Sequence, residues 1–450
     1  MKRHFWLAGA LALGAVAAQG ADSGLLLISI DGMRPDYVTR ASEHGLKIPH
    51  LVELMKEGAY AKGVKGVLPT VTYPSHTTLL TGVWPARHGI HSNTTFDPLG
   101  KNAGGWYWYA EDNHAPTLWK AAADAGLQVG SVSWPVSVSA AGVHYLIPEY
   151  WRASTDDDLK LMRAISTPGL MAHLGEQFGP YITDLERAIP GDHQRTRYSV
   201  AILKEHHPDL FTIHLAALDH LEHQSGPFSK ESNAVLEEID GMVGELEAAM
   251  RASHPNAVIC VVSDHGFTKV DHHLRLLSAF VDAGLVTLDE KAAAPKVVKW
   301  QAIPWNDGGS AAIMLHDPAD EATRAKTAEL LRRLAADPAN GIAGVLDRKA
   351  IAAHGGAPEA AFWVDMKSNF AINGAVGKPL AVEVSTRGTH GYSPDNPDLL
   401  ASFFIQGPGI GRGLDLGEID MRSIAPTLAK FLGVKLDAAE LRPLELSGRK

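Results

Sequence analysis

Short apolar runs alternate along the chain with longer stretches of helical periodicity, and this alternation restricts the possible folds more than any other feature. The run at 25–30 is almost continuously apolar, as expected of a strand buried on both faces. Comparable runs occupy 129–133, 210–215, 258–262 and 402–405, and helix candidates occupy 49–57, 116–125, 192–205, 232–252 and 424–431. The alternation predicts an α/β fold with a mostly parallel central sheet and helices on both faces. In such sheets the ligand site lies outside the carboxyl ends of the strands.

The segment 271–387 departs from this alternation. It contains stretches rich in alanine and proline, a helix candidate at 324–336 and two short β-like runs at 310–315 and 361–366. We therefore predict a smaller α+β subdomain inserted into the sheet domain, which would comprise residues 21–270 and 388–450.

The N-terminus has the pattern of an export signal. Residues 2–4 are basic, residues 5–18 form an apolar stretch too short to span a bilayer, and residues 18–20 supply small residues before a cut near Ala21. A membrane anchor is the alternative interpretation. We expect residues 1–20 to be a signal peptide, and the mature protein to be periplasmic or secreted with no stable membrane span.

Composition excludes one class of partner. The 450 residues carry a formal net charge of -10, so binding to a nucleic-acid polymer is not expected, because such binding needs a basic surface. An acidic balance still permits a small phosphate-bearing substrate if the site holds cations. The single cysteine, Cys260, permits no internal disulfide and lies in an apolar run, so we expect it in a buried strand. Nothing in the sequence indicates the oligomeric state.

Aspartate and histidine residues follow several of the predicted strands. Six such residues occur at four places in the chain: Asp31, Asp219, His223, Asp264, His265 and His390. Carboxylates with imidazoles, and no thiolate, suit zinc, and two zinc ions need about six protein ligands when each keeps an open position. Asp31 alone would fit a helix cap or a turn, and His390 alone would fit a loop imidazole bonded to the backbone. Their joint occurrence predicts a site for two Zn²⁺ ions.

A candidate nucleophile lies in the segment 68–82, which begins as a turn and continues with a helical pattern. Pro74 suits a first helical position, so Thr72 would lie at a helix N-terminus, where backbone N–H groups favour an anion. A hydroxyl needs a base or a metal ion to become a nucleophile. Thr72 fits a helix cap equally well, and this reasoning does not separate it from Thr70 or Ser75.

Two longer motifs carry a family resemblance. Residues 69–76 read Pro-Thr-Val-Thr-Tyr-Pro-Ser-His, and residues 82–93 begin Gly-Val-Trp-Pro and end His-Gly-Ile-His-Ser-Asn. These motifs resemble the nucleotide pyrophosphatase/phosphodiesterase (type I phosphodiesterase) family of the alkaline phosphatase superfamily, and the six Asp and His positions follow in the same order. The chain departs from the family pattern at Tyr73, where the family has Phe, and at Ser75, where it has Asn.

The resemblance implies an alkaline-phosphatase-like fold and specific residue roles. It implies that Thr72 is the nucleophile and forms a phosphothreonine intermediate, and that Asn93 helps to hold the phosphoryl oxygen. It also implies two zinc sites, one formed by Asp219, His223 and His390 and the other formed by Asp31, Asp264 and His265 in contact with Thr72.

The implied protein is a secreted two-zinc phosphodiesterase or nucleotide pyrophosphatase acting on phosphodiester or phosphoanhydride bonds of a small molecule. Residues 148–151, Pro-Glu-Tyr-Trp, resemble the family segment Pro-Thr-Tyr-Trp beside the phosphate. Tyr73 and Tyr150 are therefore candidates for stacking on a nucleobase, or alternatively for packing in the core or at the rim.

Other functions remain as alternatives. A phosphate monoesterase of the same superfamily would use extra cationic side chains, for which Arg152, Lys160 and Arg163 fall in a plausible region. A sulfatase would need a Cys-x-Pro-x-Arg context, which the sequence lacks. A non-catalytic zinc-binding envelope protein is disfavoured, because no ligand position and no nucleophile is missing.

Overall fold

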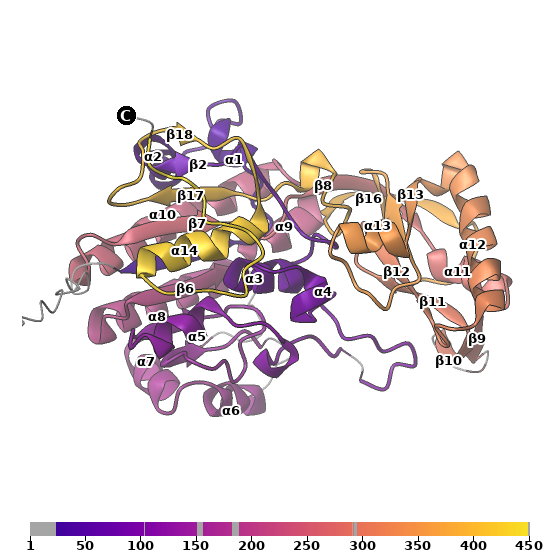
Figure 1. The fold of residues 1–450 in the computed structure, drawn as a ribbon, viewed down its shortest axis with the longest axis horizontal. Helices are drawn as coiled ribbons and strands as arrows, with labels where there is room; N and C mark the ends of the chain where they lie inside the picture. Colours follow the sequence, from indigo (N-terminus) through magenta and orange to yellow (C-terminus); the bar gives the residue numbers. More distant parts are fainter. Residues whose placement is uncertain are drawn as a thin grey trace, which may run out of the picture.

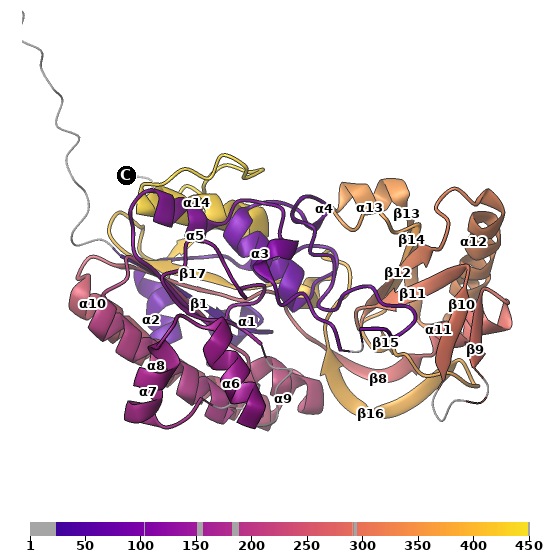
Figure 2. The same ribbon diagram turned by 90° about the horizontal axis from the view of Figure 1, so that it is seen from below.

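The computed structural model describes residues 24–448, except 103, 151–155, 182–188, 290 and 292–294. The predicted signal peptide, residues 1–20, lies outside the described residues. The described chain forms a larger part built on a mostly parallel sheet and a smaller β-rich part beside it (Figures 1 and 2). Among the described residues, no helix has both the length and the apolar character needed to cross a membrane.

Within the described residues, an eight-stranded sheet forms the centre of the larger part. In spatial order its strands are β18 (Leu414–Asp415), β2 (Ala59–Tyr60), β17 (Phe403–Gln406), β7 (Val258–Val262), β1 (Leu25–Ile30), β6 (Leu210–Leu215), β4 (Val129–Val132) and β5 (Tyr145–Ile147). β1 pairs in parallel with β6 and β7, whereas β17 runs antiparallel to both β7 and β2. The predicted α/β class with a mostly parallel sheet is confirmed.

Helices cover both faces of this sheet (Figure 2). One face carries α3 (Thr72–Thr81), α5 (Leu118–Asp124) and α14 (Ile424–Leu432), and the other carries α2 (Pro49–Glu57), α8 (Ile189–His206) and α10 (Lys230–Ser253). The remaining α-helices and strands of the larger part, within the described residues, are α1 (Asp36–Thr39), α4 (Pro85–His88), α6 (Asp156–Ile165), α7 (Leu170–Phe178), α9 (Ala217–Ser225), β3 (Gly63–Lys65) and β19 (Glu418–Asp420).

The central strand β1 is buried on both faces because its alternate residues enter two different cores. Leu26, Ile28 and Ile30 pack in the core beneath α2, α8 and α10. Leu25 and Leu27 pack in the core beneath α3, α5 and α14. The same two-sided burial explains Cys260, which lies on β7 and is fully buried, as predicted.

The smaller part contains two sheets and a hairpin. Its elements are β8 (Thr268–Leu274), α11 (Leu276–Asp282), β9 (Val286–Asp289), β10 (Lys296–Trp300), β11 (Ala302–Asn306), β12 (Ser310–Leu315), α12 (Glu321–Ala336), β13 (Ile342–Asp347), α13 (Arg348–Ala353), β14 (Phe362–Met366), β15 (Phe370–Ile372) and β16 (Ala381–Thr389). The predicted boundaries, after residues 270 and 387, fall within β8 and β16, which pair with each other and connect the two parts (Figure 2). The exact division into domains stays a prediction.

Ile28→Ala tests the central position of β1. Ile28 is fully buried, so we expect its truncation to lower the free energy of unfolding by about 2–5 kcal/mol. The matched control is Val298→Ala on β10, whose side chain is 52% exposed, which should change that free energy by less than about 0.5 kcal/mol. Urea unfolding followed by circular dichroism measures both, and equal midpoints for the two variants would contradict this description of the core.

Candidate active site

The carboxyl ends of three neighbouring strands bring the predicted ligands together. Asp31 follows β1 directly, and Asp264 and His265 follow β7. Asp219 lies in the first turn of α9, just after β6. Because β7, β1 and β6 are adjacent and parallel, these side chains meet at one edge of the sheet.

A first cluster consists of Asp31, Asp264 and His265, which are all buried. One ligand atom from each residue lies within 4.8 Å of the others. His265 Nε2 is 3.1 Å from Asp264 Oδ2 and 3.4 Å from Asp31 Oδ1. These are the three residues that the family resemblance groups in one site.

A second cluster adjoins the first through His265. Asp219, His265 and His390 each offer one atom within 4.8 Å of the others, and the rings of His265 and His390 stack with their centroids 3.8 Å apart. Asp219 Oδ1 lies 3.5 Å from His390 Nε2 and 3.4 Å from His223 Nε2. All six predicted ligands thus lie together, with His265 between the two groups.

The orientation of the imidazoles fits metal binding. His223, His265 and His390 each use Nδ1 to bond a backbone carbonyl oxygen, at 3.1–3.2 Å, so that each Nε2 faces the carboxylates. Such outer bonds fix the ring orientation of metal-binding histidines. The donor set of carboxylate and imidazole is one that divalent metal ions accept.

Several buried atoms of the clusters lack hydrogen-bond partners among the described residues. They are Asp31 Oδ1, Asp219 Oδ1, Asp264 Oδ2 and His265 Nε2. Buried polar atoms are normally bonded, and buried charges are normally paired or bound to a metal. The unsatisfied atoms therefore mark a place that a cation would complete.

The pKa values of the cluster residues also indicate a site for a cation. Burial, followed by the charges of Asp264 and Asp219, raises the pKa of Asp31 well above its usual value. Burial alone would lower the pKa of His265, but Asp264, together with Asp31 and Asp219, outweighs burial and raises that pKa to about 9. The carboxylates thus repel one another and attract positive charge.

Thr72 begins α3 and faces the same space. The capping position is occupied by Val71, so Thr72 is the first helical residue and Pro74 the third, not the first as the sequence suggested. Thr72 lines a cavity of about 70 Å³ together with Asp31, Asp219 and both His223 and His390. Among the residues lining this cavity in the described part of the chain, neither Thr70 nor Ser75 occurs.

Asn93 and Tyr73 lie on the same cavity wall. Asn93 Oδ1 accepts a hydrogen bond from Tyr73 N at 2.8 Å, which leaves the amide nitrogen of Asn93 as the donor on its other side. The Tyr73 hydroxyl donates to Glu149 at 2.8 Å. Tyr150 is not among the described residues that line the cavity; its ring packs against Trp108 at a centroid distance of 5.0 Å.

Five further residues of the cavity are absent from the sequence-based site: Trp106, Glu149, Arg195, His214 and Ala216. His214 is the one with a visible signal, because it places an imidazole inside the apolar run of β6. Burial alone would lower the pKa of His214, but Glu149 and Asp31 raise it well above its usual value.

The cationic side chains proposed for a monoesterase lie elsewhere. Lys160 is on α6 and pairs with Asp157 at the surface, and Arg163 lines a separate cavity beside Leu159. Arg152 lies outside the described residues.

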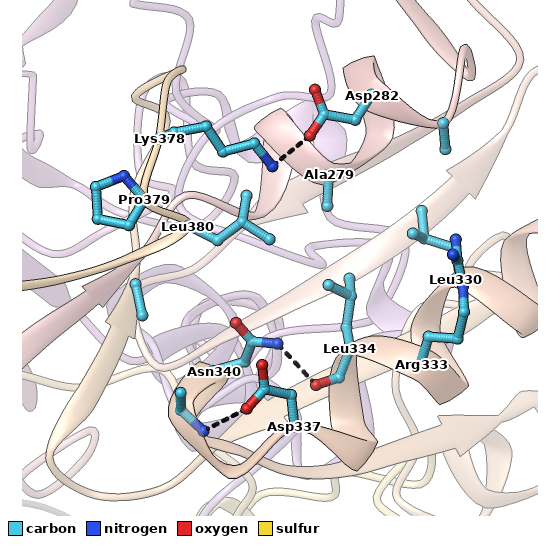
Figure 3. Close-up of a pocket in the computed structure, with 13 residues that line it drawn as sticks. Ala279, Asp282, Leu330, Arg333, Leu334, Asp337, Asn340, Lys378, Pro379 and Leu380 are labelled. Carbon is cyan, nitrogen blue, oxygen red and sulfur yellow. Dashed lines mark hydrogen bonds and ion pairs between the residues drawn. The ribbon is translucent and has the colours of Figure 1, made fainter.

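A larger cavity, of about 650 Å³, lies in the smaller part between α11, α12 and the segment before β16 (Figure 3). Lys378 pairs there with Asp282, and Asn340 donates to the Leu334 carbonyl oxygen. None of the predicted site residues line this cavity. The chemistry of the lining, not the volume, therefore locates the candidate active site at the sheet edge.

The sheet, its carboxyl-edge clusters and the hydroxyl residue at a helix start define an alkaline-phosphatase-like α/β protein. Residues 25–393 match the family model described as type I phosphodiesterase / nucleotide pyrophosphatase. The chain belongs to this family, and the predicted resemblance is confirmed.

Known relatives agree with this membership. The chain is 26% identical over 252 residues to human ectonucleotide pyrophosphatase/phosphodiesterase family member 1, covering 54% of this chain and 23% of that protein. It is 24% identical over 269 residues to human bis(5′-adenosyl)-triphosphatase ENPP4, covering 59% and 52%. The chain thus spans about half or less of the length of these curated relatives.

Solved structures share the fold. Murine ectonucleotide pyrophosphatase/phosphodiesterase 5 superposes with a TM-score of 0.63 at 19% identity, covering 92% of this chain and 96% of that chain. The human protein of the same name gives a TM-score of 0.63 at 20% identity, covering 95% and 97%.

Gly391→Ala tests how the backbone holds His390. Gly391 has φ +85°, and an added Cβ would lie 1.6 Å from the Asp307 carbonyl oxygen. We expect the variant to displace His390 and to lose at least one bound metal ion per chain. The control is Gly409→Ala, with φ +80° but no atom within 4 Å of the added Cβ, which should share the backbone strain and keep its metal. Elemental analysis of both folded variants measures this, and equal metal contents would contradict it.

Proposed function

We propose that the chain is a secreted two-zinc phosphodiesterase and nucleotide pyrophosphatase that acts through a phosphothreonine intermediate on Thr72. The observation that carries this proposal is the position of Thr72 in one cavity with the unsatisfied carboxylate oxygens of Asp31 and Asp219. A hydroxyl residue beside a cation site and at a helix N-terminus is suited to attack an anionic phosphoryl group.

Two groups of residues would hold the zinc ions: Asp31, Asp264 and His265 in one, and Asp219, His223 and His390 in the other. Bound zinc would supply Lewis-acid activation of a hydroxyl and neutralisation of charge on phosphoryl oxygens. Because His265 contacts members of both groups, it is expected to keep the two sites close.

The residues of the chain then suggest a two-step reaction. The Thr72 hydroxyl gives up its proton, its Oγ attacks phosphorus and the Oγ–P bond forms, the bond to the leaving oxygen breaks, and that oxygen takes up a proton in exchange. A water molecule next attacks the phosphothreonine, the Oγ–P bond breaks, and the hydroxyl of Thr72 is restored. Asn93 would donate its amide N–H to a non-bridging oxygen, which stabilises the charge that develops there.

The substrate class follows from relatives and from the cavity wall. One relative is named as a bis(5′-adenosyl)-triphosphatase, and murine ectonucleotide pyrophosphatase/phosphodiesterase 5 has been solved, in an inactive form, in complex with AMP. We assign nucleotides or other small phosphodiesters to this chain. Trp106 lines the cavity, and its ring centroid lies 5.3 Å from that of Tyr73. Its ring offers a surface on which a base could stack.

Thr72→Ala tests the nucleophile. The variant keeps all six proposed ligands, so we expect it to bind two zinc ions per chain but to lose turnover of bis-p-nitrophenyl phosphate by about 1,000-fold or more. Thr72→Ser, which retains a hydroxyl, should keep measurable activity. Zinc content and steady-state kinetics check both, and near-wild-type turnover of a clean Thr72→Ala preparation would overturn the assignment.

A second candidate, a phosphate monoesterase, is favoured by one observation. Arg195 lines the cavity and is 2% exposed, and a fixed cation there suits the extra charge of a monoester. Its Nη1 lies 2.5 Å from Asp192 Oδ1, and the same carboxylate accepts bonds from Ala216 N and Ala217 N at the start of α9. Arg195 is thereby held in a fixed place beside the site.

Comparison of two substrates distinguishes these candidates. A diesterase should show the higher kcat/KM with bis-p-nitrophenyl phosphate, and a monoesterase with p-nitrophenyl phosphate. Arg195→Gln should lower kcat/KM for the monoester more than for the diester, by about 10-fold or more, because the monoester dianion carries one more charge. Arg195→Lys, which keeps the charge, serves as the control. An equal loss of kcat/KM on both substrates would contradict a role for Arg195 in binding the extra charge of the monoester.

A further inference from the structure

We propose that His214 is a positioning residue for the metal centre, and that with Glu149 and Tyr73 it links the ligand Asp31 to the helix start that carries Thr72. This inference rests on the metal site of the proposed function. It concerns residues outside the six ligands.

His214 connects two buried carboxylates. It is the fifth of the six residues of β6 and is 2% exposed. Its Nε2 lies 3.0 Å from Asp31 Oδ2, and its Nδ1 lies 2.7 Å from Glu149 Oε2. Both nitrogens of the ring are therefore engaged, and the ring has one orientation.

This contact determines which oxygen of Asp31 remains for a metal ion. Oδ2 is held by His214, whereas Oδ1 is buried, has no hydrogen-bond partner in the described part of the chain, and lies 3.4 Å from His265 Nε2. The carboxylate thus presents a single oxygen to the cluster. A carboxylate without the His214 bond would be able to rotate or to offer both oxygens.

Glu149 extends the link to the nucleophile. Its Oε1 accepts the hydroxyl of Tyr73 at 2.8 Å, and the backbone N–H of Tyr73 donates to Asn93 Oδ1 at 2.8 Å. Tyr73 follows Thr72 directly in the first turn of α3. The bonded series Asp31, His214, Glu149, Tyr73 therefore joins the ends of two strands to the start of the helix and to Asn93.

Metal affinity is the readout that separates positioning from packing. Loss of a partner that orients a metal ligand typically weakens metal binding about 10- to 100-fold. A residue that only fills the core would change stability and leave metal affinity unchanged.

The chain offers a matched control on the same strand. Thr212 is two residues before His214 on β6, so its side chain points to the same face of the sheet. Its hydroxyl is buried and bonds Ser131 and Trp119, neither of which is one of the six proposed ligands. Thr212→Val removes these buried bonds with little change in shape.

The experiment compares zinc affinity, by competition with a chromogenic chelator, and the visible spectrum of the Co²⁺-loaded protein. We expect His214→Leu to weaken binding of one of the two zinc ions about 10- to 100-fold and to alter the Co²⁺ spectrum. His214→Gln retains a donor toward Asp31 and is the second variant in case His214→Leu misfolds. We expect its zinc affinity to lie between those of wild type and His214→Leu. Thr212→Val should match the wild type in both measurements.

Tyr73→Phe tests the far end of the link. It removes the bond to Glu149 and leaves His214 bound to Asp31, so we expect kcat to fall with zinc affinity unchanged. If Tyr73→Phe lowered zinc affinity as much as His214→Leu, Tyr73 would not lie at the end of the bonded series farthest from the metal ligand Asp31, and the proposed order would be wrong.

The outcomes separate this inference from the proposed function. A wild-type protein that binds two zinc ions, with His214→Leu and His214→Gln unchanged in affinity and spectrum, would overturn the role of His214 alone. A wild-type protein that binds no zinc would overturn both proposals.

Discussion

The mutual repulsion of three carboxylates, two of them buried and that of Asp219 partly buried, is the constraint on which the rest of the site depends. Asp31, Asp219 and Asp264 occupy two adjoining clusters, and the charges of Asp264 and Asp219 raise the pKa of Asp31 beyond the effect of burial. Like charges that are held together away from water are strongly unfavourable unless protons or cations neutralise them. The unsatisfied oxygens of these residues thus support a metal centre independently of the family resemblance.

The fold meets this constraint by joining segments that are distant in the chain. The parallel strands β7, β1 and β6 deliver the three carboxylates to one sheet edge, because their carboxyl ends point the same way. His390 arrives from β16, which pairs with β8 on its way back from the smaller part. The smaller part therefore completes the site, since its last strand leads directly into a predicted ligand.

The strands that position the site could be predicted because burial on both faces produces predominantly apolar runs. β1, β6 and β7 have the expected bounds, 25–30, 210–215 and 258–262. An apolar run does not encode strand direction, so nothing in residues 402–405 indicated that β17 runs antiparallel. α3 begins two residues before the position that Pro74 suggests, and because every residue of this helix is buried, no alternation of exposed and buried positions marks its beginning.

The six proposed ligands could be singled out from the sequence because each follows a strand or precedes a turn, whereas the residues around them could not. His214 bonds Glu149, which is 65 positions away, and Asp31, which is 183 positions away. Local sequence carries no record of such partners. The imidazole within the apolar run of β6 was the one sequence feature that marked His214 as unusual. It did not indicate which residues His214 would contact.

Two departures from the family pattern prove to be bonded to each other. Tyr73 stands where the family has Phe, Glu149 stands where the matching segment has Thr, and the hydroxyl of the first donates to the carboxylate of the second. A Phe at position 73 would leave one buried oxygen of Glu149 without this donor, and the loss of Glu149 would remove the carboxylate partner of His214 Nδ1. The two residues are therefore mutually dependent. The proposed ligands and nucleophile match the family pattern, whereas Tyr73 and Glu149, which both line the cavity, depart from it. We therefore expect differences in substrate between this chain and its relatives to arise at these two residues.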